Sequence, residues 1–165
     1  MRTLIKGGTI VNADATARAD LLIDGETIAM IGTELEATAD RTVDASGKWV
    51  IPGGIDVHTH MELPFGGTFA KDTFETGTRA AAFGGTTTII DFAVQPRGGS
   101  LRQGLEAWQE KAEGNAVADY GFHMIMSDVT DDTLKEMDQL VHRLQRFVVD
   151  VADDLMERVV DRAIA

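Results

Sequence analysis

The alternation of strands with helices after residue 52 is the feature that most constrains the fold of this chain of 165 residues. Short apolar or β-branched runs at 55–58, 86–92 and 120–126 are each followed by a stretch predicted to be helical. Strands and helices that alternate at this spacing form parallel βα units. Three units are too few to close an eight-stranded barrel, which takes about 250 residues. We therefore expect an α/β fold with an open, parallel sheet.

Local signals predict where the first two helices begin and end. The sequence 72–75 has the form of a capping box, and Gly84-Gly85 predicts the end of that helix after about Phe83. A second helix is expected over 101–113, before the break at Gly114-Asn115. Each helix would connect two neighbouring strands of the sheet.

The third helix is predicted to be unusually long. It begins near Thr130, and no Gly or Pro interrupts the chain from there to Ala165. Apolar residues with a 3-4 spacing predict one helix of up to about 35 residues, or two helices with a bend. The apolar face either packs along its own sheet or forms a coiled-coil or dimer face.

The sequence before residue 52 predicts a separate β-rich part. Two short strands, 4–5 and 9–11, are expected to flank a turn at Gly7-Gly8. Two more strands are expected on either side of Asp24-Gly25-Glu26, a good hairpin signal. Such short strands are marginal alone and need a partner layer, so we expect a small sheet or half of a sandwich. The parts of the chain are thus N-terminal strands (1–51), βα units (52–141) and a helical tail (142–165).

Composition excludes several classes of function. The net charge of −12 disfavours nucleic acids and anionic membranes as partners, because both require a basic face. The absence of cysteine excludes disulfides and thiolate ligands, so any metal must be bound by nitrogen and oxygen atoms. No stretch approaches the roughly 20 apolar residues of a membrane span, and the N-terminus has no secretory apolar region. We expect a cytoplasmic protein.

The strongest functional candidate is the sequence PGGIDVHTH at 52–60. Residues i and i+2 of a strand point to the same side, so His58 and His60 are expected to aim both imidazoles at one point, with Thr59 facing the other way. Imidazole is the commonest metal ligand, and α/β folds bind ligands at the carboxyl ends of their strands. The pattern therefore makes His58 and His60 candidate metal ligands, and the alternative is that they are two ordinary histidines.

A hydrolytic zinc site needs at least three protein ligands, so further candidates matter. His123, in the third predicted strand, is either a third ligand or a buried histidine bonded to the backbone. Asp91 either points into the same site or caps the turn after its strand, and Asp56 is either a nearby acid or a hydrogen-bond acceptor. Leu63 and Phe65, in the loop after the pair, either line an apolar wall beside the metal or anchor the loop on the core.

Together with later blocks, this motif resembles the dihydropyrimidinase and D-hydantoinase family of the amidohydrolase superfamily. The resemblance covers roughly residues 1–141 and corresponds to the N-terminal portion of the family. The blocks that carry it are 52–60, 63–68, 71–72, 75–81, 84–91, 111–115 and 119–124.

The resemblance implies a zinc-dependent hydrolase that opens the cyclic amide ring of dihydropyrimidines or hydantoins. The implied fold is α/β: a partial TIM barrel of about three βα units, preceded by a small β-sandwich portion and ending in a long helix. In that picture His58 and His60 bind the more buried of two zinc ions, and Leu63 and Phe65 shape the pocket for the substrate side chain. A small cyclic amide or imide is then the ligand, and a homo-oligomer is expected.

The sequence departs from the family near Val141. Family chains run to more than twice this length, and their bridging lysine follows the helix that matches 130–141, whereas no lysine follows Lys135 here. The later metal-binding histidines and the catalytic aspartate of the family have no counterpart, so no catalytic residue is assigned. Either the gene is truncated or frameshifted, or a short protein has a helical cap of its own. Two functions follow: a cyclic-amide hydrolase of which this is the N-terminal portion, or a non-catalytic interaction module with a helical dimerisation face.

Overall fold

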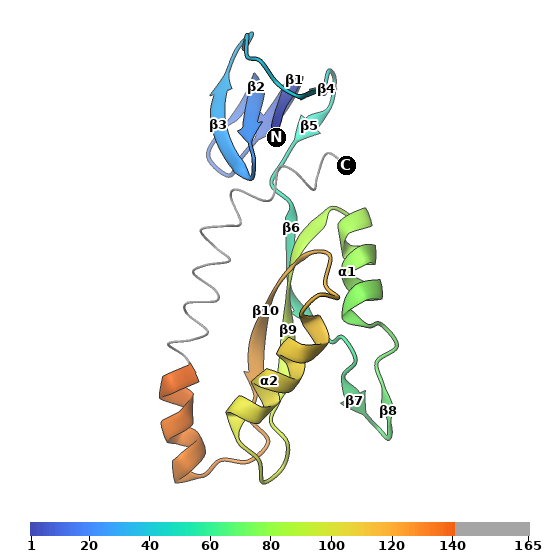
Figure 1. Cartoon of the computed structure of the whole chain (residues 1–165), viewed down its shortest axis with the longest axis vertical. Helices are drawn as coiled ribbons and strands as arrows, with labels where there is room; N and C mark the ends of the chain where they lie inside the picture. The colour runs from blue at the N-terminus through green and yellow to red at the C-terminus, as the bar shows by residue number, and fades with distance from the viewer. Residues whose placement is uncertain (141–165) are drawn as a thin grey trace. The chain divides into compact units, whose positions relative to one another are not determined.

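The computed structural model of the chain describes residues 1–140 and shows two compact units in that range (Figure 1). Unit 1 comprises Met1–Gly53, and unit 2 begins at Gly54. The predicted tail at 142–165, and with it any extension of the third helix past residue 140, lies outside the described residues. Within residues 1–140, no helix is both long and apolar enough to cross a membrane.

Unit 1 is a five-stranded sheet in which β1 is central. The strands pair in the order β3-β2-β1-β4, and β5 also pairs with β1. β2 is antiparallel to β1 and to β3, whereas β4 and β5 run parallel to β1. Its small core contains Ile5, Leu21, Ile23 and Ala45. The strands are β1 (Arg2–Val11), β2 (Thr16–Asp24), β3 (Thr27–Gly32), β4 (Arg41–Asp44) and β5 (Trp49–Val50).

The predicted turn at Gly7-Gly8 is wrong, because β1 continues through it as one strand. The pairing of β1 with β2 shifts register between Ile5 and Gly8, which marks a bulge. Gly7 has a φ of 73° and donates its N–H to the Asp20 carboxylate at 2.7 Å. The positive φ that glycine permits is thus used to bulge the strand rather than to reverse it. The hairpin predicted at 24–26 is confirmed by β2 and β3.

Asp20 is the nearly buried acid that fastens this bulge. It is 5% exposed and also accepts a hydrogen bond from the backbone N–H of Leu35 at 2.9 Å. The hydrogen bond from Gly7 lowers the pKa of Asp20 most, and the bond from Leu35 acts in the same direction, against partial desolvation. A single carboxylate therefore joins β1, β2 and the segment after β3.

Unit 2 is built of parallel βα units, as the sequence predicts. Its three-stranded sheet has the order β10-β9-β6, and both pairings are parallel. A short hairpin of β7 and β8 follows β6, and residues 131–140 are helical. The elements are β6 (Gly54–Thr59), β7 (Pro64–Phe65), β8 (Thr68–Phe69), α1 (Phe74–Phe83), β9 (Thr86–Val94), α2 (Leu101–Ala112) and β10 (Asp119–Ile125).

The helices begin where their capping residues are. Thr73 caps α1 and exchanges hydrogen bonds with Thr76, and Ser100 does the same with Gln103 at the start of α2. Thr130 and Thr133 make the reciprocal bonds before the helical residues 131–140. The predicted starts of all three helices are therefore confirmed, and so is the end of α1 at Phe83.

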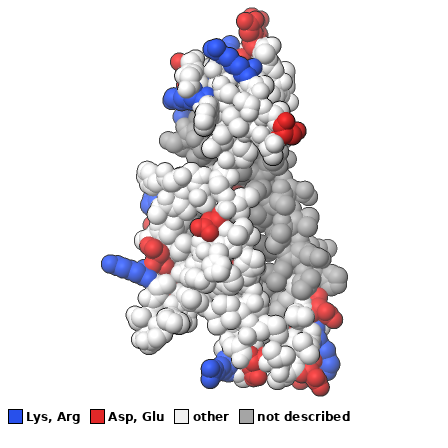
Figure 2. All heavy atoms as spheres, turned by 180° about the vertical axis from the view of Figure 1, so that it is seen from behind, with Lys and Arg blue, Asp and Glu red and all other residues white. Residues whose placement is uncertain are grey.

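The helices cover one face of the sheet of unit 2, and the strand β6 is exposed. In Figure 1, α2 crosses in front of β9 and β10. The core on this side contains Phe74, Ile89, Ala93, Leu105, Trp108 and Phe122, among others. In contrast, Ile55 and Val57 on β6 are 47% and 56% exposed. Figure 2, seen from behind, shows few charged side chains over the middle of the molecule. Parallel sheets are usually covered on both faces, so β6 is an unusually open strand.

Candidate metal centre

A bulge in β6 contains the first histidine of the pair. The register with β9 passes from Asp56 opposite Ile89 to Thr59 opposite Asp91, so β6 has one extra residue there. The backbone N–H of His58 donates to Asp56 Oδ1 at 3.1 Å. Of the two roles considered for Asp56, a nearby acid or a hydrogen-bond acceptor, the structure shows the acceptor. Bulges commonly re-aim side chains beside functional sites, and this one contains His58 and precedes His60.

The imidazoles of His58 and His60 lie together at the carboxyl end of β6. Their ring centroids are 5.0 Å apart with an interplanar angle of 88°. Two imidazoles that bind one Zn²⁺ at about 2.0–2.1 Å, with a near-tetrahedral angle between them, have centroids roughly 5 Å apart. Both side chains are exposed. The spacing of the pair therefore fits two ligands of one ion.

Phe92, on β9, forms the apolar support of this pair. Its ring centroid lies 4.5 Å from that of His58 and 5.0 Å from that of His60. His123, on β10, packs on the same ring at 4.9 Å. Three histidines therefore surround one phenylalanine: two from the predicted motif at the end of β6 and one from β10.

His123 is bonded to the backbone and does not join the pair as a third ligand. Its Nε2 lies 3.2 Å from the carbonyl oxygen of Val57. A carbonyl only accepts, so Nε2 carries the proton and is not available to a metal. The backbone-bonded role is confirmed, although the side chain is exposed rather than buried. Among residues 1–140, no three histidine or acidic side chains are placed to hold one metal ion.

Asp91 lies on the opposite face of β9 from Phe92 and is completely buried. Its Oδ2 accepts from the Thr59 hydroxyl at 2.9 Å and from the Met61 N–H at 2.7 Å. Its Oδ1 accepts from its neighbour's N–H at 2.8 Å and from Trp108 Nε1 at 3.0 Å. The suggestion that Asp91 points into the metal site is therefore wrong. The expectation that Thr59 faces away from the pair is confirmed.

The two predicted pocket residues after the pair differ in their surroundings. Leu63 is half-buried and packs against the core of unit 2, so it anchors the loop. Phe65, on β7, is 81% exposed. Leu63 therefore anchors the loop on the core, whereas Phe65 does not and is accessible to a ligand.

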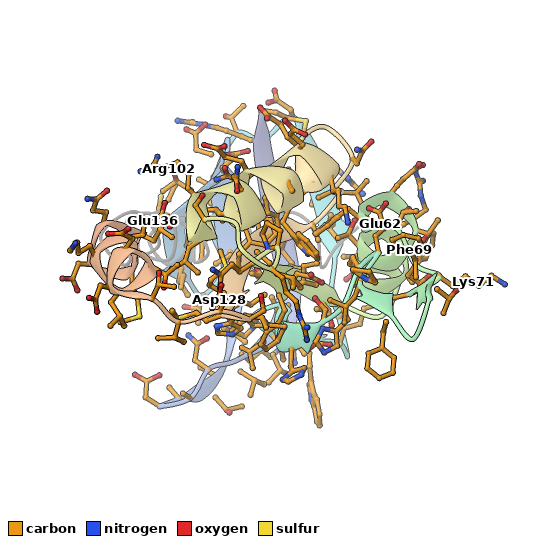
Figure 3. All side chains as sticks on the ribbon, turned by 90° about the horizontal axis from the view of Figure 1, so that it is seen from below. Glu62, Phe69, Lys71, Arg102, Asp128 and Glu136 are labelled. Carbon is orange, nitrogen blue, oxygen red and sulfur yellow. The ribbon has the colours of Figure 1, made fainter. Side chains whose placement is uncertain are left out.

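A strained residue and a lysine from α2 shape the same loop. Glu62 has a φ of 53°, which non-glycine residues rarely adopt. Lys111 Nζ donates to the Glu62 carbonyl at 3.4 Å and lies 4.2 Å from the centre of the Trp108 ring. Figure 3 shows Glu62 near α1, while Lys71 extends away from the ribbon. The contact of Lys111 with this loop and that of Trp108 with Asp91 were missed from the sequence, although a buried Trp N–H usually requires an acceptor.

Comparison with known proteins places this geometry in a family. A sequence profile of the amidohydrolase family matches residues 49–165. The chain is 63% identical over 145 residues to a D-hydantoinase of Streptomyces coelicolor. This alignment covers 85% of this chain and 31% of that protein. It is 42% identical over 144 residues to a dihydropyrimidinase of Rattus norvegicus, covering 84% of this chain and 28% of that one.

The fold agrees with the sequence comparison. The chain superposes on a crystal structure of D-hydantoinase with a TM-score of 0.84 and 52% identity, covering 87% of this chain and 31% of that one. It therefore spans less than a third of the length of these relatives. The expected extent of the resemblance, roughly residues 1–141, is confirmed by the share of this chain that they match.

Proposed function

The chain belongs to the amidohydrolase family, and we propose that it supplies part of a zinc-dependent hydrolase of cyclic amides. The relatives named above are a D-hydantoinase and a dihydropyrimidinase, which suggests hydantoins or dihydropyrimidines as substrates. In such a reaction the oxygen of water adds to a ring carbonyl carbon, the ring C–N bond breaks, and the nitrogen takes up a proton. The single observation that carries the proposal is the geometry of His58 and His60 within this family match.

We propose that β6, β9 and β10 are the first three strands of a TIM barrel, and that unit 1 is part of a β-sandwich. The TM-score of 0.84 against a D-hydantoinase supports this assignment. TIM barrels place their active sites at the carboxyl ends of the strands, which is where the histidine pair lies on β6. The corresponding domains are 1–51, 52–141 and 142–165.

In this proposal His58 and His60 hold zinc through neutral imidazole nitrogens. A bound Zn²⁺ supplies Lewis-acid activation of a carbonyl group and of water. A catalytic zinc needs three protein ligands, and residues 1–140 provide two of them, so the remaining ligands come from outside the described residues. Leu63 and Phe65 shape the pocket for the ring substituent. Phe65 contacts it directly, and Leu63 fixes the loop on the core.

Zinc binding by the full chain tests the metal assignment. We expect calorimetric titration with Zn²⁺ to show binding that is lost in His58→Ala and in His60→Ala. The matched control is His123→Ala, which removes an exposed histidine from the same cluster but leaves the proposed ligands, and it should bind zinc as the wild type does. Equal binding by all these variants would show that the pair is not the site. No zinc binding by the wild type, together with a stable dimer, would favour the non-catalytic interaction module.

A chimera tests the substrate class. Residues 1–140 would replace the matching segment of the Streptomyces coelicolor D-hydantoinase, and ring opening of hydantoin and of dihydrouracil would be measured. We expect zinc-dependent turnover that disappears on His58→Ala. A folded chimera that contains zinc and has no turnover would contradict the assignment of these residues to a cyclic-amide hydrolase.

A further inference from the structure

The Asp91 carboxylate is the point at which the candidate metal centre is tied to the rest of unit 2. It is 0% exposed and accepts hydrogen bonds from β6, from the loop after β6, from its own strand and from α2. A buried carboxylate is costly unless its oxygen atoms are satisfied, and here both are. Asp91 is not one of the proposed zinc ligands. Its side chain lies on the helix-covered face of β9, whereas the imidazoles pack on Phe92 at the other face.

Two of its donors are the residues immediately before and after His60. The Thr59 hydroxyl and the Met61 N–H both reach the same oxygen, Oδ2, at 2.9 and 2.7 Å. One oxygen atom therefore holds the Thr59 side chain and the Met61 backbone, which lie on either side of a candidate ligand. We propose that Asp91 is the positioning residue of His60: it fixes the direction in which this imidazole leaves the end of β6.

The end of β6 needs such a tie because the strand ladder stops there. The last pairing of β6 with β9 is Thr59 opposite Asp91, so His60 and Met61 lie beyond the parallel ladder. The bulge between Asp56 and Thr59 has already weakened the pairing before that point. The side chain of Asp91 continues the connection to β9 where the backbone no longer provides it.

The other oxygen connects the same carboxylate to α2. Trp108 donates to Oδ1 at 3.0 Å and is itself 5% exposed. Asp91 is thus held by a packed helix and cannot rotate without breaking a buried hydrogen bond. Phe92, the next residue, supports the imidazoles from the other face of β9. Two consecutive residues of one strand therefore constrain the pair from opposite sides.

The test compares Asp91→Asn and Thr59→Val with a matched control, Asp20→Asn. Asp20 is also a buried acid that accepts two backbone hydrogen bonds, but it lies in unit 1. Asparagine replaces one acceptor oxygen by a donor, and valine removes one donor to Oδ2 at nearly constant volume. All variants would be compared under conditions in which far-UV circular dichroism shows them to be folded.

The first readout does not involve metal. In the wild type, nuclear Overhauser effects should connect the Phe92 ring to the imidazoles of His58, His60 and His123, which all lie within 5.0 Å of it by centroid. We expect the contacts of His60 to weaken in Asp91→Asn and Thr59→Val, while those of His123 stay and Asp20→Asn changes none. Unchanged contacts of His60 in both variants would overturn the inference. If Asp91→Asn fails to fold, Thr59→Val decides.

The second readout rests on the proposed function, because it uses zinc. Residues that orient metal ligands typically change metal affinity by 10–100-fold, so we expect the Kd for Zn²⁺ to rise about tenfold in Asp91→Asn and less in Thr59→Val. The Kd of Asp20→Asn should equal that of the wild type. An unchanged Kd in folded Asp91→Asn would contradict the positioning role. A wild type that binds no zinc would contradict the proposed function instead, and the ring contacts would still decide the role of Asp91.

Discussion

The close approach of α2 to β9 makes Gly104 a sensitive test of the packing in unit 2. A Cβ atom at this position would lie 2.6 Å from the Val94 carbonyl oxygen and 3.1 Å from the Gln95 Cα. Both are backbone atoms, which cannot move aside without moving β9. Gly77 is the matched position, because it is likewise the fourth residue of its helix. A Cβ there would meet the end of the flexible Met61 side chain.

The magnitudes decide the sign of each substitution. Alanine in place of glycine stabilises a helix by about 0.8–1.0 kcal/mol, and this gain is common to both sites. Overpacking costs about 1–3 kcal/mol, and a 2.6 Å contact with a backbone oxygen belongs in the upper part of that range, about 2–3 kcal/mol. After the helical gain is subtracted, Gly104→Ala should lower the free energy of unfolding by about 1–2 kcal/mol. Turning Met61 aside costs about 0.5–1.5 kcal/mol, so Gly77→Ala should be nearly neutral.

Urea unfolding followed by tryptophan fluorescence measures this difference in unit 2. Trp108 is 5% exposed and should change its emission on unfolding, whereas Trp49 of unit 1 is already 78% exposed. With a slope of about 2 kcal/mol/M, the midpoint of Gly104→Ala should fall by roughly 0.5–1 M, while that of Gly77→Ala should not change. If Gly104→Ala is as stable as Gly77→Ala, then α2 does not contact β9 as closely as described.

Two further predictions concern an acid in unit 1 and the open strand of unit 2. The pKa of Asp20 is lowered, chiefly by the hydrogen bond from Gly7, so its contribution to stability is present above the ordinary pKa of 3.8 and is lost as the pH falls through the lowered value. We therefore expect the urea midpoint of unit 1, followed by NMR resonances of β1 and β2, to decrease less steeply with falling pH in Asp20→Asn than in the wild type at pH values below about 4. Parallel pH profiles of the two proteins would argue against this. β6 leaves Val57 56% exposed on an edge strand, so the chain should self-associate and Val57→Lys should shift it toward monomer in sedimentation equilibrium. A wild type that stays monomeric at high concentration would refute that expectation.

The boundaries of the helices were predictable because their signals are local. Thr73 and Thr130 carry capping side chains that act within three residues, and Gly84 follows the last turn of α1. The prediction of a turn at Gly7-Gly8 failed because the local signal is ambiguous. A glycine with positive φ serves a turn and a bulge equally well, and only the pairing of β1 with β2 decides between them.

The candidate site was predicted only in its local part. The i, i+2 spacing of His58 and His60 predicted that their imidazoles lie together, as they do. The role of Asp91 was not predictable, because its partner Trp108 lies 17 residues away and depends on how α2 is rotated on the sheet. The bulge in β6 also escaped prediction, since it is defined by the register with β9.

The order of the strands in unit 2 has a consequence for folding during synthesis. The sequence order β6, β9, β10 is also the order across the sheet, so each new strand of this sheet pairs with the previous strand of the same sheet. Paired residues are separated by only about 30 positions, so each closure carries a similar and modest entropic cost. Unit 2 can therefore grow one βα unit at a time from its N-terminal end as the chain leaves the ribosome, without waiting for a distant strand.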